Sequence, residues 1–558
     1  MNIDLDKIKT HLLGKATFVA TMVKESGLTD LLNKEMGSEL GRKPEIPYGT
    51  LIEMMIVNLC DDHKPLTGLK NYYNEHLDLE GIFKFPIDRE KLTDDRFGLA
   101  LDHLYDANPK RIFAKLASKL FEKYDIKITK INFDTTSKVM WGSYETPEGE
   151  ESKIEITYGH SKDKRSDKKQ VKMAIGSANG VVVDIDVLSG NASDKTYNYD
   201  KLGNIEGIIN NLNISKKEFY YIADSAFFTS KNIKRAKDKN IKFITSVPDS
   251  FKISKELKDK ALKNFDELDK IEIKASNEIG VYQISDEIKE HKGEFLKFLV
   301  YHSGPTVKKK TKSINKKIEK ENNQIQKIKK KYNSINYSCQ KDAEKARRRI
   351  INKELRNIKF HTLNLDILKS EKNRPGRPSK DPLKNKVKIE YKLEIRYESD
   401  EIKQQEALKK SCLFILSTSD LEMSGEEILR EYKTQDSVEK NFQLLKSPQF
   451  VNSLYLESIK RIEAFMYLMM ITVMIKSVVQ YVVRRELKKE NDYILGNENK
   501  KNYKPTFAVI YSVFHSVHTM TIDQEDGLIR RLTTPLSECV KKIIKALKLE
   551  PDIFIDWL

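Results

Sequence analysis

Two aspartates directly follow apolar segments that are predicted to be β-strands. Asp134 lies in the segment NFDTT, and Asp224 lies in the segment IADSA. In open α/β sheets, ligands bind beyond the carboxyl ends of the strands, so an aspartate in this position can face a cleft. Asp-Thr and Asp-Ser pairs are also common in turns and helix caps, and for either aspartate alone that role is the favoured interpretation.

A third carboxylate lies in the segment EYKTQDSVEKNFQLLKS (431–447), which is predicted to form a single helix. At 100° per residue, four polar side chains fall within about 60° of one another: Tyr432, Gln435, Glu439 and Lys446. An apolar stripe lies beside them, formed by Val438, Phe442 and Leu445. Such a helix could pack on a sheet and still face a cleft. An ordinary amphipathic helix has the same periodicity, so both interpretations stay open.

Three carboxylates at one cleft are suited to hard divalent cations, which take oxygen ligands. A pair of Mg²⁺ ions held in this way can activate water and stabilise the leaving oxygen of an in-line phosphoryl displacement. On the same helix face, Lys446 could hold a phosphate oxygen as a point charge. Tyr432 could contact a phosphate or a sugar. These residue types are therefore suited to the cleavage of phosphodiester bonds.

The composition indicates a basic globular protein of several domains. Its 558 residues are too many for one ordinary hydrophobic core. Its net charge is +17. Residues 308–356 hold most of the excess, with 14 Lys and 4 Arg against 4 Glu and 1 Asp. Such a basic surface favours a polyanion partner, most often nucleic acid. A solvated charged helix is the alternative interpretation.

Other classes of protein are disfavoured. The four cysteines lie far apart and match neither a zinc pattern nor a disulfide framework. His515 and His518 have the spacing of metal ligands, but with no third ligand nearby a helix face is favoured. The longest apolar run, 464–475, predicts a buried helix rather than a membrane span. The N-terminus lacks an apolar signal region, which predicts a cytoplasmic protein without a membrane partner.

The elements that must position these residues fall into five predicted parts. The first part is helical, and at Lys130 the pattern changes to the order β-β-β-α-β-α-β, a mixed α/β sheet. Gly180 supplies the turn of a predicted hairpin, and a helix is expected at about 198–213. The predicted boundaries are 1–128 for the N-terminal helices, 129–249 and 411–450 for the two parts of the α/β domain, 250–410 for a block inserted between them, and 451–558 for C-terminal helices, expected at 456–490 and 505–550.

The inserted block contains two features of interest. Isoleucines from Ile314 to Ile335, together with Tyr332, recur at a/d-like spacings and predict a long helix with an apolar seam and basic flanks. The segment RPGRP, with Arg374 and Arg377, resembles a Gly-Arg-Pro motif that lies in an A·T-rich minor groove. A rigid basic linker is an equally favoured interpretation of that segment.

A second basic segment, HSKDKRSDKK (160–169), precedes one of the predicted strands. It contains Lys162, Lys164 and Arg165 and is expected to lie near a DNA backbone, with a solvated hairpin loop equally favoured. Trp141 follows the first predicted strand and is interpreted as a packing residue rather than a base-stacking one.

The spacing Tyr432-x2-Gln435-x3-Glu439-x6-Lys446 resembles the Tyr-(2)-Arg-(3)-Glu-(6)-Lys signature of bacterial insertion-sequence DDE transposases. The sequence departs from that signature at one place, where Gln435 replaces the arginine. Further stretches are similar to the same family, in order from about residue 45 to the C-terminal helices: LTDDRFGLALDHLYDANP, INFDTTS, YGHSKDKRSDKKQVKMAI, GNASD, ADSAF and LLKSPQF.

The resemblance implies an RNase H-like domain of the α/β class, interrupted by an insertion domain before the Glu-bearing helix. It also implies that Asp134, Asp224 and Glu439 are the catalytic triad and bind two Mg²⁺ ions, for which Mn²⁺ can substitute. The N-terminal helical domain is expected to bind the DNA ends. The other expected DNA contacts are Tyr432, Gln435, Lys446, Lys162, Lys164, Arg165, Arg374 and Arg377.

The expected activity is that of a transposase acting on double-stranded DNA at the nucleoid, as a homodimer that bridges two transposon ends. Water would nick the transposon end, and the freed 3′-OH would attack target DNA. A nuclease or resolvase of the same fold, without strand transfer, is one alternative. A catalytically inactive DNA-binding protein is another, although a pure binder gains nothing from carboxylates that face phosphates.

Overall fold

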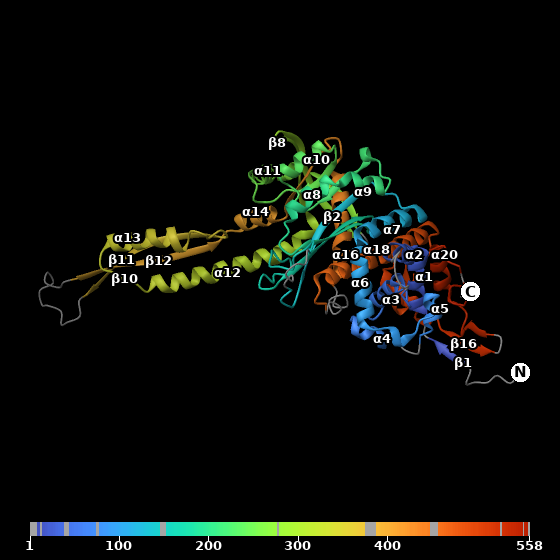
Figure 1. Cartoon of the computed structure of the whole chain (residues 1–558). Coiled ribbons are helices and arrows are strands. Elements are labelled where there is room, and N and C mark those ends of the chain that lie inside the picture. The colour runs from blue at the N-terminus through green and yellow to red at the C-terminus, as the bar shows by residue number, and fades with distance from the viewer. Residues whose placement is uncertain are drawn as a thin grey trace.

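The computed structural model describes residues 8–11, 14–37, 44–73, 77–144, 152–275, 278–373, 387–446, 456–524, 527–550 and 552–555. Figure 1 shows a body, built from a sheet and the helices around it, and a long arm that projects from one side. Both chain termini lie at the end of the body that faces away from the arm. The mixed α/β class with helical flanks agrees with the prediction.

Five strands form the centre of the sheet: β2 (Lys130–Val139), β3 (Gln170–Ala178), β4 (Val181–Ser189), β5 (Tyr220–Ala223) and β6 (Lys242–Ser246). Their order is β4-β3-β2-β5-β6. The first three are antiparallel, whereas β5 is parallel to both β2 and β6. This is the RNase H-like arrangement expected from the sequence. Asn179 and Gly180 join β3 to β4 with φ of 54° and 84°, the positive values that a tight two-residue hairpin requires.

Four more strands widen the sheet beyond β6: β13 (Leu413–Thr418), β9 (Glu294–Ser303), β8 (Glu278–His291) and β7 (Asp269–Ala275). β13 lies between β6 and β9 and is antiparallel to both. The boundary predicted at residue 250 is therefore revised, because β7–β9 belong to the central sheet. The physical reason is that β13 pairs along both of its edges. β6 pairs with one edge, and β9 pairs with the other.

The arm begins after β9 with the long helix α12 (Val307–Asn333). It continues with β10 (Asn336–Tyr337), α13 (Gln340–Arg349), β11 (His361–Asn373) and β12 (Val387–Ser399), and returns through α14 (Glu401–Ser411). The strands pair in the order β10-β12-β11. Figure 1 shows α12 running alongside the long hairpin of β11 and β12.

The arm has its own apolar core, to which α12 contributes Ile325, Ile328 and Tyr332. The predicted seam is thus largely confirmed, because Ile314 is buried as well. The helix ends before Ile335, which is 36% exposed. Since the arm buries apolar residues within itself, it is a folded unit and not a solvated charged tail.

Helices of the N-terminal and C-terminal parts pack together below the sheet. The N-terminal helices are α1 (Gly14–Glu25), α2 (Leu28–Met36), α3 (Tyr48–Cys60), α4 (Leu69–Tyr72), α5 (Leu79–Phe83), α6 (Asp94–Asp106) and α7 (Pro109–Lys123). The Thr93 hydroxyl accepts a hydrogen bond from the Arg96 amide and caps α6.

The predicted helix at 198–213 is a pair, α8 (Asp194–Gly203) and α9 (Ile205–Asn211). Next follow α10 (Ser230–Asp238) and α11 (Lys252–Lys263).

The helix α18 (Ile459–Lys489) forms the centre of this helical layer. Among the described helices it is the one long and apolar enough to cross a membrane, yet its apolar stretch is entirely buried in the protein. It packs on β4, where the Ser477 hydroxyl accepts a hydrogen bond of 3.2 Å from the Val182 amide. The apolar run therefore forms a buried core helix, as predicted.

The helix predicted at 505–550 is wrong. After the short pair β14 (Ile494–Leu495) and β15 (Lys501–Asn502), the chain forms α19 (Phe507–Val513), the hairpin of β16 (Thr519–Gln524) and β17 (Gly527–Leu532), and α20 (Glu538–Ala546). The segment TMTIDQ alternates polar and apolar residues, which suits a strand. Its partner on the other side is β1 (Ile8–His11), from the opposite end of the chain.

Candidate active site

Asp134 and Asp224 come from neighbouring parallel strands. Phe133 of β2 is in register with Ala223 of β5, so the two aspartates are the next residues along these paired strands. β5 ends at Ala223, whereas β2 continues to Val139 with β3 as its partner. Asp134 therefore lies within β2 and not at its end as predicted. The end of the shorter strand β5 is what opens the sheet beside both carboxylates.

The two aspartates have different environments. The Asp224 carboxylate accepts a hydrogen bond of 3.0 Å from the Ala226 amide. Burial raises the pKa of the Asp224 carboxyl, and the negative charge of Asp134 raises it further. Asp134 accepts hydrogen bonds from the Thr135 amide at 2.7 Å and from the Lys162 ammonium at 2.9 Å. The site thus concentrates negative charge and balances part of it with one lysine.

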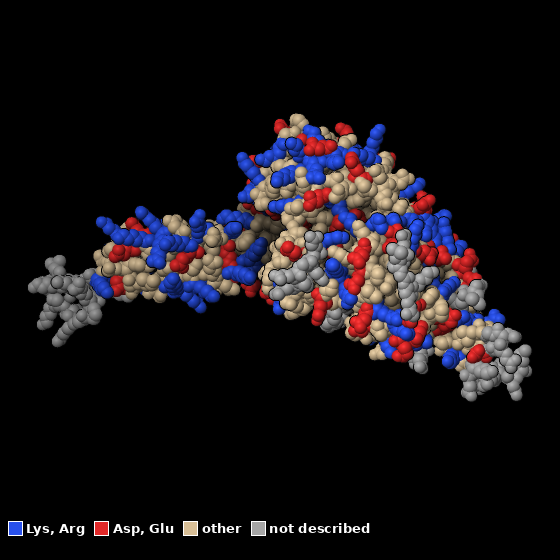
Figure 2. All heavy atoms as spheres, viewed as in Figure 1, with Lys and Arg blue, Asp and Glu red and all other residues tan. Residues whose placement is uncertain are grey.

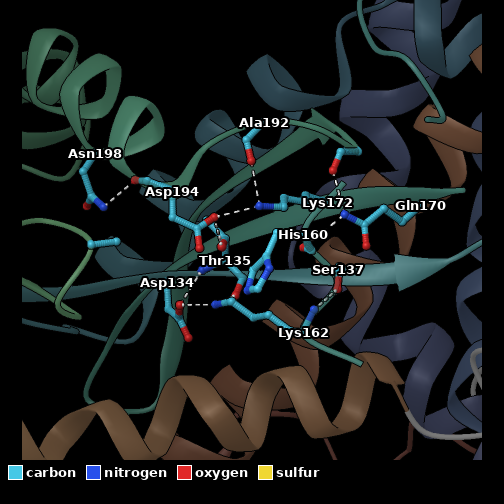
Figure 3. A network of polar contacts seen from close by, with 12 residues as sticks. Asp134, Thr135, Ser137, His160, Lys162, Gln170, Lys172, Ala192, Asp194 and Asn198 are labelled. Atoms are coloured by element: carbon cyan, nitrogen blue, oxygen red, sulfur yellow. Dashed lines mark hydrogen bonds and ion pairs between the residues drawn. The ribbon is translucent and has the colours of Figure 1, made fainter. Parts of the chain in front are cut away.

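Lys162 points into the site (Figure 3). Its ammonium contacts both the Asp134 carboxylate and the Thr135 carbonyl, and its side chain is 32% exposed. Burial alone would lower the pKa of Lys162, but the charge and hydrogen bond of Asp134 and two more distant aspartates raise it. The structure therefore places Lys162 against a carboxylate of the site, although the sequence predicted a DNA contact.

A fourth acid, Asp194, contacts Thr135, the residue that follows Asp134 in β2. Its carboxylate accepts hydrogen bonds from the Thr135 hydroxyl at 2.8 Å and from the Lys172 ammonium at 3.0 Å. The Lys162 amide also donates to the Ser137 hydroxyl at 3.0 Å, which ties the basic loop to β2 (Figure 3). Asp194 was not among the residues predicted from the sequence. The available signal was its position in GNASD, between a strand and a helix.

Glu439 lies on α16 (Asp436–Lys446), which follows α15 (Gly425–Tyr432) after a 3₁₀ turn over Lys433–Gln435. The single helix predicted for 431–447 is therefore interrupted, and residues 447–455 lie outside the described part. The hydroxyls of Thr434 and Ser437 donate to carbonyls three residues earlier, at 2.6 and 2.7 Å, which tightens this turn. The helical-wheel angles predicted from Tyr432 onward thus do not apply across the turn.

Two asparagines hold α16 on the sheet. The Asn132 amide donates to the Thr434 hydroxyl at 2.8 Å, and the Asn441 amide donates to the Ser177 hydroxyl at 3.3 Å. Val438, Phe442 and Leu445 are buried, as the apolar stripe predicted. Glu439 is exposed and lies between these two anchors. The packing of α16 therefore leaves the Glu439 carboxylate on the open side of the helix.

The pKa of the Tyr432 phenol is affected by the charges of three carboxylates. We call these three residues the acidic triad: Asp134, Asp224 and Glu439. Burial raises the pKa of the Tyr432 phenol, a hydrogen bond with the Ser246 side chain opposes this, and the charges of the triad raise the pKa further. The phenol therefore stays protonated at neutral pH and can donate a hydrogen bond. The charges of the three carboxylates therefore all act on this one phenol.

The other residues predicted to contact DNA have different surroundings in the structure. The Lys446 ammonium forms an ion pair of 2.7 Å with Asp163, so the end of α16 is tied to the basic loop. The amide nitrogen of Gln435 is buried without a hydrogen-bond partner among the residues that the structure describes. Lys164 is exposed, and Arg165 is held by Asp167 through contacts of 2.8 and 2.9 Å. Arg374 and Arg377 lie outside the described residues.

The donor set fits a hard divalent cation by its chemistry. The acidic triad offers only carboxylate oxygens, and the mutual repulsion that raises the pKa of Asp224 would be relieved by a cation. Within the described part of the chain, no three acidic, histidine or cysteine side chains are close enough to hold one ion. The acidic triad therefore does not form a closed cage for one ion in this structure.

The strand order and pairing of the central sheet define an RNase H-like fold. Residues 141–475 match the family model of the transposase DDE domain, which covers more than half of the chain. The chain therefore belongs to the transposase DDE domain family. Residues 8–118 match a second family, a domain of unknown function (DUF4277).

Similarity to individual proteins is low. No curated protein matches the chain in sequence. A solved structure of a piggyBac transposase synaptic complex with hairpin DNA aligns with 90% of this chain and 80% of its own. The identity is 8% and the TM-score is 0.34, values at which the alignment supports no detailed comparison.

Proposed function

We propose that this transposase binds the ends of an insertion sequence, hydrolyses phosphodiester bonds there and transfers the 3′-OH ends into target DNA. The observation that carries the proposal is the effect of Asp134, Asp224 and Glu439 on one phenol, that of Tyr432. A cation near that phenol would be attracted by the charges of all three carboxylates. Such a set suits phosphoryl transfer assisted by two Mg²⁺ ions, for which Mn²⁺ can substitute.

The residues of the acidic triad would hold the metal ions. When bound, the ions supply an activated water and stabilise the leaving oxygen. Tyr432, protonated at neutral pH, donates a hydrogen bond to a phosphate oxygen. The contacts of Asn132 and Asn441 keep α16 in place, so Glu439 approaches the phosphate from the open side. Lys446 is available to a phosphate once it leaves Asp163.

A strand-transfer assay tests this function. The substrate is labelled linear DNA that carries the element's inverted-repeat ends, mixed with a supercoiled target plasmid and Mg²⁺. The expected result is label covalently joined to the plasmid through the 3′ ends. Nicked products that never join would identify a nuclease or resolvase. Binding with no cleavage would identify an inactive DNA-binding protein. Ends that carry two different labels would test the proposed homodimer, which should pull both down together.

Lys162 and a divalent cation compete for the same carboxylate, that of Asp134. Replacing Lys162 by Met removes the competitor and should tighten Mn²⁺ binding about ten-fold, the factor for about 1.4 kcal/mol. That is a modest part of the Coulomb energy of a partly exposed pair at this distance. Electron paramagnetic resonance of Mn²⁺ on the DNA-free protein measures the affinity.

The matched control is Lys164→Met, an exposed lysine two residues further along the same loop, which should leave the affinity unchanged. Lys162→Arg keeps the positive charge and should behave like the original protein. An equal change for the variants at 162 and 164 would contradict the assigned competition and indicate a general effect of loop charge.

We also propose that the arm binds the DNA backbone. Figure 2 shows Lys and Arg side chains along the visible face of the arm. Four exposed lysines of α12 lie on its solvent side: Lys316, Lys317, Lys320 and Lys327. Because the core of the arm lies elsewhere on the helix, these lysines can be changed without disturbing its packing.

Replacing these four lysines by Gln should weaken duplex binding and flatten its salt dependence. Each lost phosphate contact lowers the slope of log K against log salt by about 0.9, so four contacts lower it by about 3.6. Fluorescence anisotropy between 50 and 200 mM salt measures the slope. The control changes four exposed lysines of the body: Lys217, Lys252, Lys255 and Lys263. Identical slopes for the two variants would show that the arm is no specific DNA surface.

A further inference from the structure

Trp141 lies just beyond the end of β2 and is exposed to solvent. Its exposed fraction is 65%, so the prediction of a packing role is wrong. Large aromatic side chains are normally well covered, and a tryptophan this exposed marks a surface that can accept a partner. The nearby segment contributes a second exposed ring, Tyr158, at 58%.

The backbone around Trp141 is fixed on both sides. The Met140 amide donates to the Lys169 carbonyl at 2.9 Å, and the Tyr144 hydroxyl donates to the Trp141 carbonyl at 3.0 Å. The Lys169 ammonium also contacts the Ser143 carbonyl. These contacts join the end of β2 to the basic loop, so the indole is presented from a fixed backbone and not from a free chain end.

Two cations lie over the indole ring. The Lys168 ammonium lies 4.5 Å from the ring centroid, and the Arg165 guanidinium carbon lies 5.3 Å from it. Asp167 orients Arg165 through two hydrogen bonds. An aromatic face next to positive charge is the combination that proteins use for single-stranded nucleic acid. The base stacks on the ring, and the cations bind the neighbouring phosphates.

The position of Trp141 relative to Asp134 sets which nucleotide it could reach. Seven residues separate them along an extended chain, which spans at most about 23 Å at 3.3 Å per residue. A DNA strand rises about 3.4 Å per nucleotide. A strand that follows β2 from the acidic triad would therefore reach Trp141 within about six or seven nucleotides. The basic loop that carries Arg165 and Lys168 also carries Lys162, which contacts Asp134.

We propose that Trp141 is a stacking platform for an unpaired base of the DNA strand, with Lys168 and Arg165 beside it to bind the adjoining phosphates. The base must be unpaired, because bases inside a duplex are already stacked on both faces and extruding one costs free energy. The partner is therefore a single-stranded segment, within about seven nucleotides of the cleaved bond. This inference rests on the proposed DNA-cleaving function of the same site.

Intrinsic fluorescence provides a direct test, because Trp557 is the only other tryptophan of the chain. The full-length Trp557→Phe variant reports Trp141 alone. We expect its fluorescence to be quenched by a single-stranded oligonucleotide and by a duplex with a single-stranded tail. A blunt duplex of equal length should quench it much less. Asp134→Asn should leave the quenching unchanged, since stacking requires no cleavage.

Binding measurements on Trp141→Ala complete the test. Affinity for the tailed duplex should fall about ten-fold or more, within the range for loss of one base–aromatic stack, and affinity for the blunt duplex should change less than two-fold. Trp141→Phe, which keeps a ring, should recover most of the loss. Equal affinity of Trp141→Ala and the original protein for tailed DNA would overturn the platform. Failure of every DNA to bind would instead overturn the proposed function.

Discussion

Cleavage of DNA that carries the element's ends is expected to fall more than about 100-fold when Asp134, Asp224 or Glu439 is replaced by its amide. Loss of an outer-shell partner of a metal site already costs about 10- to 100-fold, and these residues are proposed to bind the metal directly. Each amide keeps the size of the side chain and removes its charge. Denaturing gels of labelled substrate with Mg²⁺ measure the cleavage rate.

The control for these variants is Glu422→Gln, which removes an exposed carboxylate away from the acidic triad. Its cleavage rate should stay within two-fold of the original. DNA binding by the three triad variants should persist, because their positions contribute acids and no cation. Unchanged cleavage in one variant would remove that residue from the site, and lost binding would show damage to the fold.

The second large effect is on stability. Lys201 of α8 is buried and forms ion pairs with Asp184, at 2.6 Å, and with Asp186 on β4. Lys110 of α7 reaches Asp186 from the other side. Burial raises the pKa of Asp184, but the Lys201 charge opposes this. Replacing Lys201 by Met leaves the buried Asp184 carboxylate without its ion-pair partner and leaves Asp186 with Lys110 alone, so it should lower the free energy of unfolding by about 3–5 kcal/mol.

Urea denaturation followed by circular dichroism measures this loss. Lys195→Met, at an exposed position of the same helix, is the matched control and should change stability by less than about 0.5 kcal/mol. Combining Lys201→Met with Asp184→Asn and Asp186→Asn should recover much of the loss, because no buried charge then lacks a partner. An unfolding midpoint for Lys201→Met equal to that of Lys195→Met would refute the role of this network.

The strands of the central sheet were predictable because their signals are local. Alternation around Ile131 and Phe133, and the Asn179–Gly180 turn, are read within a few residues. The extension by β7–β9 depends on pairing between strands more than 100 residues apart in sequence, as in the contact of Leu299 with Leu416. Hydrophobic periodicity does not reveal which distant strands pair with each other. The predicted start of the inserted block, at residue 250, was therefore too early.

For the candidate site, the elements that carry the three acids were predictable from the sequence. Asp134, Asp224 and Glu439 have clear positions in strands and helix, but their surroundings depend on tertiary contacts. Lys162 looked like any solvated lysine of a basic loop, and only the fold brings it to Asp134. The turn at Thr434 arises from hydroxyl contacts that compete with the helix, and helical periodicity does not register them.

The arm also has a consequence for synthesis of the chain. It lies between β9 and β13 in the chain, and together with β7–β9 it separates β6 from its partner β13, so Ser246 must wait for Leu416, about 170 residues later, before the two strands can pair. At a translation rate of roughly 5–20 residues per second, the edge of β6 stays open on the ribosome for about 10 to 30 s. The acidic triad is completed later still, because Glu439 follows β13 in the chain. A nascent chain that ends before α16 therefore carries the two aspartates without Glu439.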